Sequence, residues 1–318
     1  MRLAAVVLGL SLVTAACGGS DDDGDDAAGG STNSGAELSG QIRMDGSSTV
    51  TPLMSLAAED FQKDNPNVRV TVGTSGTGGG FEKFCQGETD FSMASRPIKD
   101  EEVAACKAKN IEPLELIVAN DGLSVVVNPQ NNWAKCLTVE HLKKAWEPGS
   151  TVKSWKDVDP SFPDVKLTLF GPGSDSGTFD YFTDEINGEE GATRTDYNPS
   201  EDDNVIVTGV AGDRGAMGYF GLSYLLENEG KVKGVEIDGG KGCVAPTNDT
   251  VQAGEYTPLG RPLFIYAKAE AAKRPEVKAF AEYYFEHQRA ITEEGLFVPL
   301  TAEQVTKAQT DLAAIEAA

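Results

Sequence analysis

The sequence is short of basic residues. Its 318 residues include 50 Asp and Glu but only 27 Lys and Arg, which gives a formal net charge of −23 at pH 7. A nucleic-acid-binding protein needs a basic face, so this composition argues against such a partner. It also argues against an anionic ligand, unless donors aimed from a closed cleft outweigh a general field that salt screens beyond about 8 Å.

Metal-binding and catalytic side chains are also scarce. There are only two histidines, His141 and His287, and no two cysteines have Cys-x-x-Cys spacing, so a zinc site is poorly supported. An enzyme that transfers a group would need an activated nucleophile, a general base or metal ligands. We therefore expect a protein that is not an enzyme and that uses no cofactor or metal.

The N-terminal apolar run is too short to cross a membrane. Residues 3–13 follow Arg2 and lead through small residues to Cys17, which predicts a secretory signal peptide over residues 1–16. Since Cys17 directly follows Ala15 and Ala16, the segment resembles a bacterial lipobox, and we expect Cys17 to be lipidated, with palmitate. The alternative is an ordinary secretory signal with an unrelated cysteine.

Residues 17–37 consist largely of Gly, Ser and Asp and lack apolar periodicity. Such a segment cannot bury a core, and it predicts a flexible acidic tether that holds a globular body off a membrane. We expect the body to lie at the extracytoplasmic face of the cell membrane, held there by the lipid anchor.

The four remaining cysteines agree with export. Four cysteines allow three pairings, and the pairing that is local in the sequence is Cys85–Cys106, which leaves Cys136–Cys243. Structural disulfides are favoured outside the cytoplasm, and buried free thiols are the alternative.

Beyond the tether, strands and helices alternate as in an open α/β sheet, over about 280 residues that are enough for two lobes. Helical spacing after Thr51 and Pro52 predicts a helix that ends near Asn65, and residues 188–204 are polar and rich in turns. Apolar runs predict strands at 68–72, 90–94, 116–119, 123–127, 166–170, 216–220 and 262–266.

Three segments rich in Gly, Ser and Thr precede expected helices: 46–49, 75–80 and 176–178. The first N–H groups of a helix lack internal partners and carry partial positive charge, so such segments bind anions. The first and third are equally explained as helix N-caps. Capping does not require the four glycines of 75–80, which we expect to form a loop before a helix that begins near Phe81. This loop matches neither a Walker A sequence nor a dinucleotide fingerprint.

One cationic residue, Arg96, follows the strand at 90–94 and adjoins Ser95. Its guanidinium offers a planar fork of donors that suits an oxyanion. The alternative is a surface arginine paired with a carboxylate.

Five motifs in a fixed order resemble those of the phosphate-binding lipoproteins of bacterial phosphate ABC transporters, in the branch typical of cyanobacteria and actinobacteria. They occupy residues 46–50, 75–81, 90–98, 171–180 and 260–266. The resemblance implies an α/β, two-lobed type II periplasmic-binding-protein fold, with hinged lobes and phosphate bound in the cleft between them.

In this fold, residues 38–120 and 255–318 would form lobe 1 and residues 121–254 lobe 2, with hinges near 121–127 and 260–265. The resemblance implies that the chain captures inorganic phosphate and delivers it to the permease subunits of an ABC transporter. We expect a monomer that meets the membrane only through its lipid.

The resemblance also implies the phosphate-binding residues by position. They are Ser48, Thr49, Ser75, Thr77, Gly78, Ser95, Ser176, Gly177 and Thr178. The best-studied members carry an aspartate where this chain has Ser95 and an arginine where it has Pro172. We infer that Arg96 supplies the cation instead, oriented by Asp175 or Asp180.

The missing aspartate bears on selectivity. A carboxylate acceptor favours an anion that carries a proton, such as phosphate, and repels sulfate. Another acceptor must replace it, and Asp45 is a second candidate. Sulfate, molybdate or tungstate binding, an exported phosphoryl-transfer enzyme, and a role as a sensor or adhesin stay open as alternatives.

Overall fold

In the computed structural model of this protein, residues 37–174 and 176–317 are described. The predicted signal peptide, the lipidated Cys17, most of the acidic tether and the candidate Asp175 lie outside them. Within the described part, no helix has the length and apolar character needed to span a membrane.

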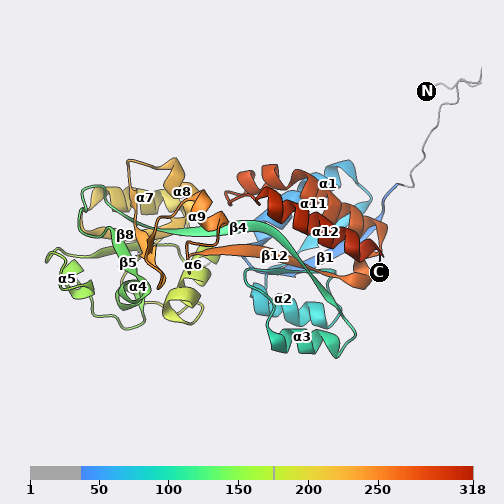
Figure 1. Cartoon of the computed structure of the whole chain (residues 1–318), viewed down its shortest axis with the longest axis horizontal. Helices are drawn as coiled ribbons and strands as arrows, with labels where there is room; N and C mark the ends of the chain where they lie inside the picture. The colour runs from blue at the N-terminus through green and yellow to red at the C-terminus, as the bar shows by residue number, and fades with distance from the viewer. Residues whose placement is uncertain (1–36, 175, 318) are drawn as a thin grey trace, which may run out of the picture. The chain divides into compact units, whose positions relative to one another are not determined.

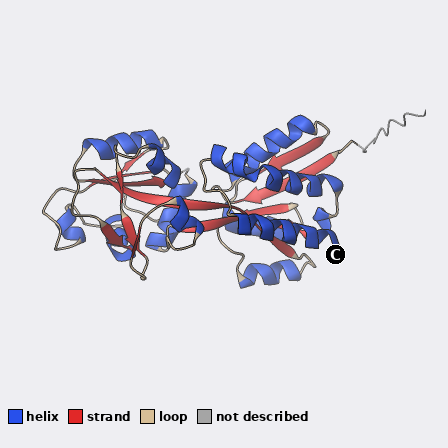
Figure 2. Ribbon diagram, turned by 45° about the horizontal axis from the view of Figure 1, so that its top comes forward, coloured by secondary structure: helices blue, strands red, loops and turns tan. Residues whose placement is uncertain are grey.

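Lobe 1 begins with three parallel strands that form one end of a nine-stranded mixed sheet. Helices cover both faces of these strands (Figures 1 and 2). The strands are β1 (Gly40–Gly46), β2 (Val68–Val72) and β3 (Phe91–Ala94). One face carries α1 (Thr51–Asp64), α11 (Pro275–Glu294) and α12 (Ala302–Ala317), with the short α10 (Ala269–Ala272), and the other carries α2 (Gly76–Cys85) and α3 (Asp100–Lys107).

Lobe 2 completes the large sheet and adds a small three-stranded one. Its part of the large sheet is β6 (Thr168–Gly171), β7 (Asn198–Pro199), β8 (Ala216–Gly221) and β9 (Lys233–Gly234), and the small sheet is β5 (Cys136–Thr138), β10 (Glu236–Asp238) and β11 (Cys243–Val244). Its helices are α4 (Val139–Trp146), α5 (Trp155–Val158), α6 (Gly177–Phe182), the π-helical η1 (Thr183–Asn187), α7 (Asp203–Gly212), α8 (Leu222–Glu227) and α9 (Asn248–Gln252). Its core combines aliphatic side chains with aromatic rings, among which Phe182 stacks on Tyr219 with ring centroids 3.9 Å apart.

Two antiparallel strands, paired with each other, form the crossover between the lobes (Figure 1). They are β4 (Pro113–Val127), which joins the two strands predicted at 116–119 and 123–127 into one, and β12 (Gly260–Lys268). Ala119 and Leu263 belong to the lobe 1 core, whereas Leu123 and Leu259 belong to the lobe 2 core. The change of core therefore falls at residues 120–122 and 260–262.

A third segment also joins the lobes. Val298 pairs with Asn120 of β4 through two backbone hydrogen bonds of 2.9 Å, and its side chain packs in the lobe 2 core. The Gln252 amide of α9 donates to the carbonyl of Pro299 at 2.8 Å.

The glycine-rich segment at 75–80 is not the predicted loop. Helix α2 begins at Gly76 rather than near Phe81, so these glycines form its first turns. The helix lies against β1, and a Cβ atom at Gly80 would lie 2.5 Å from Gly46 Cα. Glycine is needed here for close packing of a helix on a strand.

Both predicted disulfides are present. Cys85–Cys106 ties α2 to α3, and Cys136–Cys243 ties β5 to β11 in the small sheet. The helix α7, which starts inside the segment read as turns, was not predicted.

The contact at Gly80 gives a stability prediction. Gly80→Ala places a methyl group against Gly46 and the Asp45 carbonyl, 2.9 Å away, so the free energy of unfolding should fall by about 1–3 kcal/mol, as overpacking does. Gly78→Ala in the same helix meets nothing within 4 Å and should stabilise by up to about 1 kcal/mol through helix propensity. Urea unfolding compares the two, and equal losses would contradict the packing argument.

Candidate functional site

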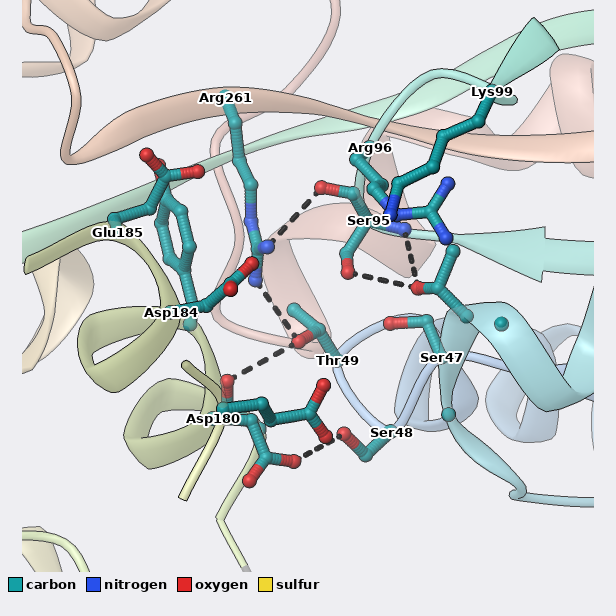
Figure 3. A pocket seen from close by; sticks show the side chains of 16 residues that line it. Ser47, Ser48, Thr49, Ser95, Arg96, Lys99, Asp180, Asp184, Glu185 and Arg261 are labelled. Carbon is teal, nitrogen blue, oxygen red and sulfur yellow. Dashed lines mark hydrogen bonds between the residues drawn. The ribbon is translucent and has the colours of Figure 1, made fainter. Parts of the chain in front are cut away.

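A cleft of about 280 Å³ lies where the two lobes face each other (Figure 3). Both lobes and one crossover strand line it. The lining residues are Ser47, Ser48, Thr49, Gly76, Thr77, Gly78, Ser95, Arg96, Lys99, Gly177, Asp180, Tyr181, Asp184, Glu185, Glu190 and Arg261.

Lobe 1 contributes the ends of its parallel strands and the helix starts that follow. The chain turns after β1 at Gly46, whose φ of 146° and proximity to Met93 exclude a side chain. Ser95 follows β3, and its N–H donates to the Thr77 hydroxyl at the start of α2, at 3.2 Å. The carboxyl ends of parallel strands meet at one edge of a sheet, which gathers these donors into one place.

Lobe 2 contributes the N-terminus of α6. Ser176 caps this helix, because its hydroxyl accepts from the Thr178 N–H at 3.2 Å. Two contacts then cross to lobe 1: the Thr49 hydroxyl donates to the Gly177 carbonyl at 3.4 Å, and the Ser48 hydroxyl donates to Asp180 Oδ2 at 3.3 Å. The lobes thus touch at the floor of the cleft.

Arg261 is the charged residue at the centre of this arrangement (Figure 3). Its guanidinium lies over the Tyr181 ring, 3.3 Å from the centroid, and donates to the Ser95 carbonyl at 3.1 Å and to the Thr49 hydroxyl at 3.2 Å. These contacts use two of its five N–H groups, while its buried Nε makes no hydrogen bond. A cation held this way has donors left for an anion in the cleft.

Arg96 is placed differently from what the sequence predicted. Its guanidinium makes a bidentate pair with Glu102 of α3, at 2.8 and 2.9 Å, and lies 5.8 Å from the Phe81 ring centroid. Neither Asp180 nor any other cleft carboxylate of the described residues orients it. Burial would raise the pKa of Glu102, but hydrogen bonds from Arg96 and the Lys99 N–H outweigh it and leave that pKa below its usual value.

Ser75 and Asp45 are joined by a hydrogen bond beside the cleft. The Ser75 hydroxyl donates to Asp45 Oδ1 at 2.6 Å, and Lys83 pairs with Oδ2 at 2.6 Å. Burial opposes ionisation of Asp45, but these hydrogen bonds dominate and lower its pKa. Both carboxylate oxygens of Asp45 thus already accept a hydrogen bond, which argues against Asp45 as the acceptor for a ligand proton.

Four carboxylates, Asp180, Asp184, Glu185 and Glu190, line the lobe 2 side. Burial raises the pKa of Asp180, Glu185 and Glu190, with the Arg261 charge acting in the opposite direction in each case. Lys99, at the start of α3, faces them from lobe 1. The walls of the cleft therefore carry opposite charges, donors and cations on lobe 1 and carboxylates on lobe 2.

The structure brings together most of the predicted residues and separates a few. Ser48, Thr49, Thr77, Gly78, Ser95, Arg96 and Gly177 line the cleft, whereas Ser75, Ser176 and Thr178 lie beside it. Sequence reasoning missed Arg261, although it belongs to the motif at 260–266. Among the described residues, no group of three or more His, Cys, Asp or Glu is placed to hold a metal ion, and the donor set suits a small tetrahedral anion.

A match to a family model gives the class of this protein. Residues 31–288 match the model of the PBP superfamily domain.

Individual relatives identify the family within this superfamily. The chain is 47% identical over 270 residues to the protein SphX of Synechococcus elongatus, covering 84% of this chain and 80% of that protein. It is 41% identical to the phosphate-binding protein PstS of Staphylococcus haemolyticus, covering 92% and 90%. The crystal structure of a possible phosphate binding protein from Planctomyces limnophilus superposes with a TM-score of 0.85 at 46% identity, covering 87% and 99%. The chain belongs to the phosphate-binding-protein family of substrate-binding proteins within this superfamily.

The inter-lobe contact at Gly177 gives a prediction. A Cβ atom there would lie 2.7 Å from the Thr49 hydroxyl and 2.9 Å from its N, so Gly177→Ala should hold the lobes apart. Oxyanion affinity measured by calorimetry should fall about tenfold or more, in line with the steric cost of overpacking. Gly212→Ala, at the end of α7 with nothing within 4 Å, is the control, and an equal loss in both variants would contradict the contact's role.

Proposed function

We propose that the protein is an extracytoplasmic receptor that binds inorganic phosphate between its lobes and delivers it to an ABC permease. The observation that carries the proposal is the Arg261 guanidinium, which faces a cleft ringed by hydroxyl and backbone donors and retains unused N–H groups. Donors of this kind, held out of bulk water, bind a compact oxyanion without moving. The names of the relatives above support phosphate as that anion.

Membership of this family supports further proposals about the anchor, the partners and the oligomeric state of the receptor. We propose that a lipid on Cys17 anchors it, that the tether lets it reach permease subunits, and that it acts as a monomer. Phosphate that bridges donors from both lobes favours the closed form by its additional contacts there, and the permease recognises that form.

We predict different losses of phosphate affinity when each of the two arginines of the cleft is replaced. Arg261→Ala should weaken phosphate binding by about 100-fold or more, because it removes a charged donor from a largely buried site. Arg96→Ala should weaken it less than about tenfold, because the Arg96 guanidinium is already paired with Glu102.

Isothermal titration calorimetry of both variants with phosphate checks this ranking, and thermal unfolding confirms that each variant folds. The reverse ranking would restore Arg96 as the ligand's cation, as the sequence predicted. Binding of neither phosphate nor any other oxyanion by the wild type would overturn the proposed function.

Asp180 is the best-placed acceptor for the proton of phosphate. It lines the cleft next to Ser48, and burial raises the pKa of its carboxyl group. An ionised carboxylate accepts a hydrogen bond from a protonated oxyanion and repels sulfate, which has no proton to donate.

Asp180→Asn should therefore narrow the ratio of phosphate to sulfate affinity by about tenfold or more, mainly by allowing sulfate to bind. Competition calorimetry at pH 7 measures the ratio. Glu190→Gln, which removes a charge from the same wall without contacting Ser48, is the control. If both variants change the ratio equally, the discrimination comes from the general charge of the wall.

A further inference from the structure

Arg261, the cation of the proposed site, lies at the hinge between the lobes rather than within either lobe. Arg261 of β12 and Asp121 of β4 are direct partners in the antiparallel pairing of the two crossover strands. They lie where the lobe 1 core gives way to the lobe 2 core. The distance between their backbones is set by strand pairing, so it does not depend on how far the cleft is open.

The ion pair between Arg261 and Asp121 is long and lacks a hydrogen bond. Arg261 Nε lies 3.5 Å from Asp121 Oδ2, and the two side chains are only 15% and 14% exposed. At that distance Nε makes no hydrogen bond, so the pair lacks the geometry that makes a buried ion pair strong. Burial also raises the pKa of Asp121 despite the neighbouring guanidinium, which agrees with a weak pairing.

We propose that Asp121 is the internal counter-ion of Arg261, and that the bound anion competes with it for the guanidinium. The inference rests on the proposed function. In the empty cleft, the Asp121 carboxylate offsets a cation that would otherwise be buried alone. Once phosphate accepts hydrogen bonds from the guanidinium, the same carboxylate still attracts that guanidinium and so competes with the bound anion for it.

This arrangement suits a receptor that must release its ligand. Because strand pairing keeps Asp121 beside Arg261 in open and closed forms alike, this competition acts throughout the binding cycle. It lowers the affinity of the site and shortens the lifetime of the complex. Asp121 is thus a positioning and tuning residue, one that acts on phosphate through Arg261.

The test is Asp121→Asn, which keeps the size of the side chain and removes its charge. Phosphate should bind about fivefold tighter or more, because the attraction between the guanidinium and an internal carboxylate, at an effective dielectric constant of about 20, no longer competes with the anion. The dissociation rate measured by stopped-flow should fall by a similar factor. In an Arg261→Gln background, titrated at millimolar phosphate, the gain from Asp121→Asn should disappear.

Asp184→Asn is the matched control, because it removes an equal charge from the cleft wall that does not pair with Arg261. Any gain in affinity from this variant should persist in the Arg261→Gln background. It should also shrink at high salt, as interactions of solvent-facing charges do.

Weaker or unchanged phosphate binding by Asp121→Asn would overturn the inference, as would a gain that persists without Arg261. Should Asp121→Asn fail to fold, as judged by circular dichroism, Asp121→Ser provides the same test. Failure of the wild type to bind phosphate contradicts the proposed function instead. A wild type that binds through Arg261 but gains nothing from Asp121→Asn contradicts only this inference.

Discussion

An arginine side chain that is only 15% exposed needs partners for its charge, and the cleft is organised around those of Arg261. The Tyr181 ring lies beneath it, the Ser95 carbonyl and the Thr49 hydroxyl accept from it, and Asp121 faces it from the next strand. Tyr181 comes from lobe 2 and Thr49 from lobe 1. The arginine therefore connects both lobes to the crossover, which is where a ligand that favours one lobe arrangement should act.

The position of this cation explains how an acidic chain can take up an anion. The excess of negative charge lies largely on exposed side chains, where salt screens it, whereas the cleft donors are aimed and shielded. The carboxylates on the lobe 2 wall are close enough to matter. They stand opposite Lys99 and the Arg96–Glu102 pair, and under the proposed function they select against anions that offer no proton.

Much of the fold and part of the site follow from the sequence. Helix α1 and strand β2 were predicted within a residue or two, because apolar periodicity and a proline in the first helical turn are local signals. The start of α2 was misplaced, since glycine normally disfavours a helix and only the packing of Gly80 on Gly46 explains it.

The charged residues of the site were harder to predict. Arg96 and Arg261 carry the same charge and both belong to recognisable motifs, and no local pattern tells them apart. Glu102, one helical turn into α3, takes up Arg96, while Asp121, 140 positions from Arg261 in the sequence but its direct neighbour in the sheet, leaves Arg261 partly unpaired. Pairings across a sheet depend on register, which a single sequence does not specify.

The central claim is that Arg261, on the hinge, is the cation that holds the ligand. A crystal structure of the protein grown with phosphate and without sulfate tests it most directly. We expect one tetrahedral anion within hydrogen-bonding distance of the Arg261 guanidinium, the hydroxyls of Ser48 and Thr77, and the first N–H groups of α2 and α6. An anion held by Arg96 with Arg261 out of reach, or an empty cleft at saturating phosphate, would contradict it.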